Sequence, residues 1–168
     1  VDEEAVRRAF QAEGRSAAHC ALALAETKAR IVSERHRRAL VIGADQILVC
    51  DGDWFGKPAG LADARAQLWA LRSRTHELAT AACVVRDGDR IWHTVARPSL
   101  TMRAFSEAFV DDYLAAEGGA ALSTVGAYRL EGRGIQLFAH VEGDQFAILG
   151  LPLLELLDFL RRRGELPR

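Results

Sequence analysis

Asp45 is the first residue whose type and setting suggest chemistry. It lies within the apolar segment ALVIGADQILVC, residues 39–50, where a buried carboxylate costs free energy unless a cation or hydrogen bonds compensate it. A metal ligand or a general base would be held on such a rigid segment. An aspartate at a strand end, with its oxygens bonded to backbone N–H groups, would give the same pattern. Both interpretations stay open at this point.

The two lysines are the next candidates. The chain has 22 basic residues, and all but Lys28 and Lys57 are arginines. A lysine ammonium is a compact point charge that suits phosphate oxygens. Lys57 lies in the tripeptide GKP, whose glycine and proline would hold the loop that presents it. A solvated loop lysine is the competing interpretation.

Two further features have both a structural and a functional interpretation. Glu3 and Glu4 follow Asp2 near the N-terminus, where carboxylates are favoured in the first turn of a helix by its dipole. The glycines of GAYRLEGRG, residues 126–134, allow close backbone approach to a ligand or form an ordinary turn. The sequence contains no Walker A, GxGxxG or GxSxG motif, and its histidines lack metal-ligand spacing.

The elements that must position these residues follow from capping and turn signals. Asp2 and Ser16 each precede a helical pattern, over residues 3–11 and 17–36, and Ser106 precedes one over 107–118. The DGD tripeptides at 51–53 and 87–89 predict turns, the second within a hairpin. We also expect helices over 61–72 and 153–163, and two strands around a loop over 126–144. This order predicts one α/β domain, residues 1–168, with a mixed, twisted sheet flanked by helices.

Composition limits the classes of function. The 168 residues carry a net charge of −1 and are 49% hydrophobic, which argues against a protein that coats nucleic acid or an anionic membrane surface. No apolar run is long enough to cross a bilayer, and the acidic N-terminus is unlike a signal peptide. The three separated cysteines predict reduced thiols. We expect a cytoplasmic protein.

Seven segments occur in one order along nearly the whole chain: LAETKA, IGADQILVCDG, FGKP, RTHELATA, VGAYRLEGRGIQLF, VEGD and ILGLPL. In these segments and their order, the chain resembles the Maf family, the septum-formation-inhibitor-like nucleotide pyrophosphatases. The resemblance implies a fold like that of inosine triphosphate pyrophosphatases. It also implies hydrolysis of a nucleoside triphosphate to its monophosphate and pyrophosphate with a divalent cation, Mg²⁺ or Mn²⁺.

The resemblance further implies roles for particular residues. Asp45 corresponds to the family's proton acceptor and metal-associated carboxylate, and Glu3 to its N-terminal catalytic glutamate. Lys28 and Lys57 correspond to the family's two substrate-binding lysines. Gln46 and Glu131 occupy positions related to base preference, and this pair resembles the branch that prefers 7-methyl-GTP. The RTHE segment is closer to the pyrimidine branch.

The chain also departs from the family. The usual first strand and SxSxRR-type phosphate loop, roughly 30 residues in all, are not found in this sequence. An alternative function is therefore a nucleotide-binding or regulatory module that does not turn over, linked to cell division through the family's name. The family often forms homodimers, and we expect a nucleoside triphosphate, rather than nucleic acid or a membrane, as the partner.

Overall fold

The structure is a computed structural model that describes residues 1–167. They divide into two compact units: residues 1–46 with 79–97 and 144–167, and residues 47–78 with 98–143. Two long strands, β1 (Val41–Cys50) and β3 (Thr75–Arg86), each contribute to both units. The six-stranded sheet has the order β2-β1-β3-β5-β6, with β4 also paired to β3.

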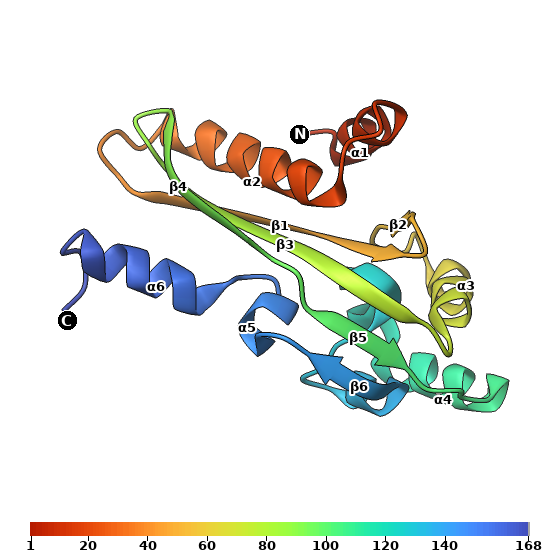
Figure 1. The fold of residues 1–168 in the computed structure, drawn as a ribbon. Coiled ribbons are helices and arrows are strands. Elements are labelled where there is room, and N and C mark those ends of the chain that lie inside the picture. The colour runs from red at the N-terminus through yellow and green to blue at the C-terminus, as the bar shows by residue number, and fades with distance from the viewer. Residues whose placement is uncertain (168) are drawn as a thin grey trace. The chain divides into compact units, whose positions relative to one another are not determined.

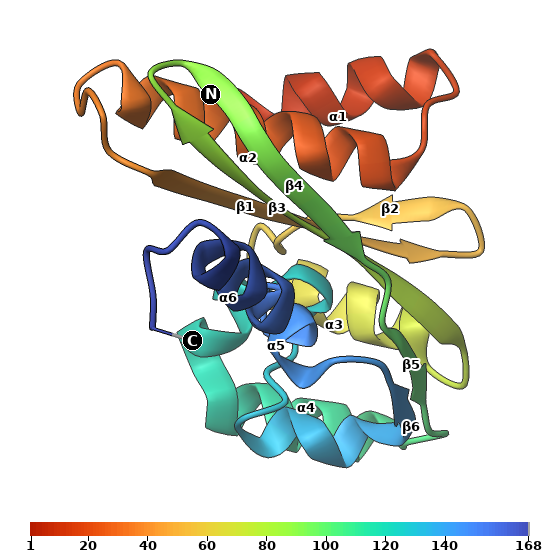
Figure 2. The ribbon, with the colours of Figure 1, turned by 60° about the vertical axis from the view of Figure 1, so that its left-hand side comes forward.

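The first unit is layered. Helices α1 (Glu3–Ala12) and α2 (Ala17–Ser33) cover one face of its strands, which are parts of β1 and β3 together with β4 (Asp89–Ala96) (Figures 1 and 2). Helix α6 (Leu153–Arg162), preceded by the short α5 (Gln145–Ile148), covers the other face. Buried Leu156 and Phe159 of α6 pack with Val84, and Phe159 stacks on Trp92 with ring centroids 5.1 Å apart. This apolar contact holds the C-terminal helix to the sheet.

The helix starts and the hairpin turn form as local sequence predicts. The side chains of Asp2 and Ser16 accept hydrogen bonds from the N–H groups of Ala5 and His19, which caps α1 and α2. At the turn between β3 and β4, Asp87 and Gly88 have φ of 52° and 88°. Two consecutive left-handed residues suit the right-handed twist of a two-residue hairpin.

The second unit contains the remaining strands and helices. Strands β2 (Asp53–Phe55), β5 (Ser99–Met102) and β6 (Phe138–Glu142) accompany helices α3 (Leu61–Leu71) and α4 (Glu107–Glu117). Three 3₁₀ turns follow: η1 (Gly118–Ser123), η2 (Val125–Ala127) and η3 (Arg133–Leu137). The 126–144 segment thus contains one strand, β6, and the prediction of two strands there is wrong. Gly126 and Ala127, both with positive φ, break the extended pattern that a strand needs.

The α/β class with helices flanking a sheet is confirmed. The pairs β1–β2, β3–β4, β3–β5 and β5–β6 are all antiparallel, which corrects the expected mixture of parallel and antiparallel pairs. Cys20, Cys50 and Cys83 are free and buried. Within residues 1–167, no helix has both the length and the apolar character to span a membrane.

Candidate active site

Asp45 lies in the middle of β1, not at its end, and only 6% of its side chain is exposed. Because successive side chains of a strand point to opposite faces, Asp45 shares a face with Gly43, and Gly43 packs against α2. Its Oδ1 accepts a hydrogen bond from Lys28, and its Oδ2 is buried without a hydrogen-bond partner. The alternative of a strand-end aspartate bonded to backbone N–H groups is therefore wrong.

Lys28 projects from α2 and links two carboxylates. Its Nζ lies 2.5 Å from Asp45 Oδ1 and 2.7 Å from Glu3 Oε1, and 34% of its side chain is exposed. Its position follows from close packing, since the alanines of α2 and Gly43 of β1 leave no large side chain between the helix and the strand. The ammonium can therefore reach the strand while remaining partly open to solvent.

Helix α1 supplies one carboxylate and one guanidinium cation to the same cluster. Glu3, in the first turn, is joined by Arg7 one turn later, whose Nη2 lies 3.4 Å from Glu3 Oε2 and 3.8 Å from Asp45 Oδ2. Only 15% of the Arg7 side chain is exposed, and its Nε is buried without a hydrogen-bond partner. Two carboxylates and two cations thus meet at one place in the first unit, and Arg7 was not among the residues predicted from the sequence.

The electrostatics of the cluster follow from its burial. Removal from water raises the pKa of the Asp45 carboxyl, and Lys28 and Arg7 oppose this rise by favouring the carboxylate. Burial lowers the pKa of Lys28, but its hydrogen bonds to Asp45 and Glu3 outweigh that effect and leave the pKa above its ordinary value. Lys28 is therefore a firmly protonated cation beside a carboxylate that water solvates poorly.

The cluster fits a divalent cation only as part of a shared site. Within residues 1–167, no group of three or more His, Cys, Asp or Glu side chains is placed to hold a metal ion. Mg²⁺ usually takes one or two protein carboxylates and completes its shell with water and substrate phosphates. Glu3 and Asp45 provide two carboxylates, and among the described residues Asp45 Oδ2 accepts no hydrogen bond and has only the distant Arg7 guanidinium, at 3.8 Å, beside it. These two residues match that donor set.

Gln46 follows Asp45 and points to the other face of the strand. Its Nε2 donates to Thr80 Oγ1 at 2.7 Å and lies 3.1 and 3.2 Å from the carbonyl oxygens of Ala147 and Ile148. The amide nitrogen thus joins β1 to β3 and α5 within the first unit. Its Oε1 is the atom that these bonds leave for other interactions.

The chain is similar to known proteins over nearly its whole length. Residues 1–163 match the family described as Maf-like protein. The chain belongs to the Maf family. The matched residues cover more than four fifths of the length of each relative named below, so the similarity extends over most of each protein.

Three curated proteins are similar to this Maf chain along most of its length. It is 60% identical over 166 residues to a nucleoside triphosphate pyrophosphatase of Paramagnetospirillum magneticum, covering 99% of this chain and 86% of that protein. It is 55% identical to a protein of the same name from Rhodospirillum rubrum, covering 99% and 82%. It is 49% identical to a 7-methyl-GTP pyrophosphatase of Mesorhizobium japonicum, covering 99% and 83%.

The remaining predicted residues of the Maf chain, Lys57 and Glu131, lie in the second unit. Lys57 is exposed in the loop between β2 and α3 and forms no ion pair with any residue that the structure describes. Glu131 Oε1 accepts a hydrogen bond from Arg129 Nε at 3.1 Å, and Arg129 also lies 4.0 Å from Glu117. Glu117 in turn accepts a hydrogen bond from the N–H of Arg133. The Glu131 carboxylate is thus held by a neighbouring guanidinium.

Sequence reasoning also missed a buried pair in the second unit. His76 Nε2 and the hydroxyl of Tyr128 form a hydrogen bond of 2.8 Å, and the rings of both pack against Phe138. Burial lowers the pKa of His76 to about 4, so the imidazole is neutral. Both residues belong to family-like segments, RTHELATA and VGAYRLEGRGIQLF. Their hydrogen bond joins β3 to the loop that carries Glu131.

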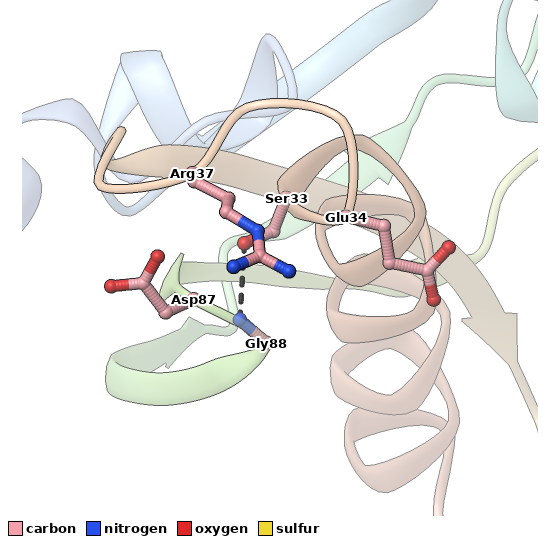
Figure 3. A pocket seen from close by; sticks show the side chains of 5 residues that line it. All are labelled: Ser33, Glu34, Arg37, Asp87 and Gly88. Carbon is pink, nitrogen blue, oxygen red and sulfur yellow. Dashed lines mark hydrogen bonds between the residues drawn. The ribbon is translucent and has the colours of Figure 1, made fainter.

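One cavity of the first unit contains none of the predicted residues. It has a volume of about 420 Å³ and lies between the C-terminal end of α2 and the β3–β4 turn, lined by Ser33, Glu34, Arg37, Asp87 and Gly88 (Figure 3). The Gly88 N–H donates to Ser33 Oγ, and Asp87 Oδ1 accepts from the N–H of Arg38. Because these groups bond to one another, they explain the attachment of the hairpin to α2.

Proposed function

We propose that this protein hydrolyses a nucleoside triphosphate to the nucleoside monophosphate and pyrophosphate. In the proposed reaction a water oxygen bonds to the α-phosphorus, and the bond from that phosphorus to the bridging oxygen breaks. The names of the relatives and the membership of the Maf family support this activity. The observation that carries it is the buried Asp45 carboxylate, which has one oxygen on Lys28 and the other without a hydrogen-bond partner.

The proposed chemistry divides among the residues by charge. A triphosphate carries about four negative charges, so cations must neutralise it. A divalent cation held by Glu3 and Asp45 would polarise the phosphate oxygens. Asp45 would accept the proton of the attacking water, because burial raises its pKa and so makes it a better base. Lys28 and Lys57 would bind phosphate oxygens through their ammonium groups.

For the base, we propose 7-methyl-GTP or another non-standard nucleotide. A carboxylate at Glu131 can accept hydrogen bonds from guanine N1–H and the 2-amino group, which pyrimidines lack. A 49% identical relative is named 7-methyl-GTP pyrophosphatase. Arg129 Nε donates a hydrogen bond to Glu131 Oε1 and so orients the carboxylate that would meet the base.

The test is pyrophosphate release by the purified full-length protein from 7-methyl-GTP, GTP, UTP, CTP and dTTP, with Mg²⁺, Mn²⁺ or a chelator. We expect release that requires the metal and is fastest with a guanine nucleotide. Binding of nucleotide without release from any substrate would contradict the proposal and favour a regulatory binding module. The same panel identifies the preferred metal.

The proposal includes two further expectations from the family. One is that the enzyme works as a homodimer, which light scattering over a range of concentrations would test. The other is that it acts in the cytoplasm on free nucleotides, which fractionation of cells with an antibody to the protein would test. A monomeric mass at every concentration would contradict the first, and enrichment in another fraction would contradict the second.

A further inference from the structure

We propose that Arg7 is a further substrate-binding residue, which leaves the two carboxylates when a divalent cation binds and then contacts the phosphates. The inference rests on the proposed function and concerns the same cluster. In this proposal Arg7 exchanges one set of anionic partners, the Asp45 and Glu3 carboxylates, for another, the oxygens of a polyphosphate.

Lys28 and Arg7 contact different oxygens of the Asp45 and Glu3 carboxylates. Lys28 takes one oxygen of each acid, Asp45 Oδ1 and Glu3 Oε1, at 2.5 and 2.7 Å. Arg7 faces the other oxygen of each, Asp45 Oδ2 and Glu3 Oε2, at 3.8 and 3.4 Å. A cation that binds through Asp45 Oδ2 and Glu3 Oε2 therefore competes with Arg7 and leaves the Lys28 contacts in place.

The two contacts of Arg7 with these carboxylates are long. Charge-assisted hydrogen bonds between guanidinium and carboxylate are usually about 2.7–2.9 Å long, and both Arg7 contacts exceed that range. Its buried Nε and the buried Asp45 Oδ2 have no hydrogen-bond partner, although buried polar groups normally have one. A ligand that brings a cation to Asp45 and oxygen acceptors to Arg7 satisfies both atoms.

The charges of Glu3, Asp45, Arg7 and Lys28 balance one another. Two carboxylates and two cations sum to zero, so the cluster alone gives little attraction to an anion. A divalent cation on the carboxylates changes this sum to +2 and frees the guanidinium. Arginine presents a planar fork of donors that matches phosphate oxygens. The metal therefore creates the positive site that a di- or triphosphate needs.

The test uses direct binding and a matched control on the same helix. Arg8 is the neighbour of Arg7, is exposed, and has no contact with the cluster among the described residues. Arg7→Gln and Arg8→Gln remove the same charge from α1. Binding of Mn²⁺ alone is measured by electron paramagnetic resonance, and binding of inorganic pyrophosphate in the presence of Mn²⁺ by calorimetry.

We expect Arg7→Gln to bind Mn²⁺ alone about three- to tenfold more tightly than Arg8→Gln, because a competing cation is gone. It should bind pyrophosphate with Mn²⁺ about tenfold more weakly. Equal Mn²⁺ affinity in the two variants would overturn the proposal, as would unchanged pyrophosphate affinity. Circular dichroism checks that both variants are folded. These binding measurements stay informative if the protein proves not to release pyrophosphate, so the two proposals can fail separately.

Discussion

The carbonyl oxygen of Ala25 lies where a side chain at position 43 would begin. A Cβ built on Gly43 would be 2.2 Å from that oxygen and 2.8 Å from Ala29 Cβ. The backbone of α2 therefore lies directly on β1 at this point. One turn of helix after Ala25 is Lys28, and two residues along the strand is Asp45, so the same close approach sets the lysine–aspartate contact.

Gly43→Ala should separate the helix from the strand and weaken catalysis. Overpacking of a close contact usually costs about 1–3 kcal/mol, and the displaced Lys28 should reduce kcat by at least about tenfold. Gly60→Ala is the control, because nothing lies within 4 Å of a Cβ there and its φ is 178°. Denaturant unfolding and steady-state kinetics measure both effects. Normal kcat in a destabilised Gly43→Ala would show that the packing serves stability alone.

Asp45→Asn should abolish turnover and leave the fold intact. The amide has the shape of the carboxylate but can neither accept a proton from water nor hold a divalent cation well, so we expect kcat to fall by about 10²–10⁴. Pyrophosphate release measures the loss, and circular dichroism measures the fold. Retention of a near-normal rate would remove Asp45 from the mechanism.

Glu131→Gln should change base preference more than overall rate. The amide keeps one acceptor and gains donors, so it should discriminate less strongly in favour of guanine. We expect the ratio of kcat/KM for 7-methyl-GTP to that for UTP to fall by about tenfold. Glu142→Gln, at a carboxylate that is 77% exposed, is the control. An unchanged substrate profile would contradict the role of Glu131.

The buried His76 should make stability depend on pH. Its pKa is about 4 in the folded protein and near 6.5 in the unfolded chain, so the unfolded chain takes up a proton first as pH falls. Its contribution is fully present above about pH 6.5 and is lost towards pH 4, by about 3 kcal/mol. Urea unfolding of the wild type and of His76→Gln from pH 8 to 4 measures the difference. The variant should be less stable at pH 8 and should lose less stability on acidification.

The matched control for this effect is His140→Gln, at a histidine whose side chain is 67% exposed. Its pH profile of stability should follow that of the wild type. Parallel profiles for His76→Gln and the wild type would show that other groups govern the acid sensitivity.

The features that the sequence predicted well, helix caps and a hairpin turn, depend on interactions between residues close in sequence. The caps at Asp2, Ser16 and Ser106 and the turn at residues 87–88 need only neighbouring residues to form. The 126–137 segment differs, because its left-handed Ala127 is held by a hydrogen bond from the Tyr113 hydroxyl. Such a distant partner cannot be recognised from a local pattern.

In the candidate site, too, some residues could be recognised from the sequence and others only from the fold. Lys28 stood out because lysine is rare in this chain, and Asp45 because it interrupts an apolar strand. Arg7 is one of many arginines in the sequence. Only its contacts with Glu3 and Asp45 in the folded protein distinguish it from the others. His76 and Tyr128 are separated by 52 positions, so their pairing required the fold.

The buried cysteines make the protein convenient for site-specific labelling. Burial raises the pKa of the Cys20 thiol to about 11 and also raises those of Cys50 and Cys83. At pH 7 about one Cys20 in ten thousand is a thiolate, and none of the three side chains is exposed. A single cysteine introduced at exposed Arg8 would therefore react with a maleimide dye far faster than the native thiols. A fluorophore there would report on α1 while metal and pyrophosphate bind.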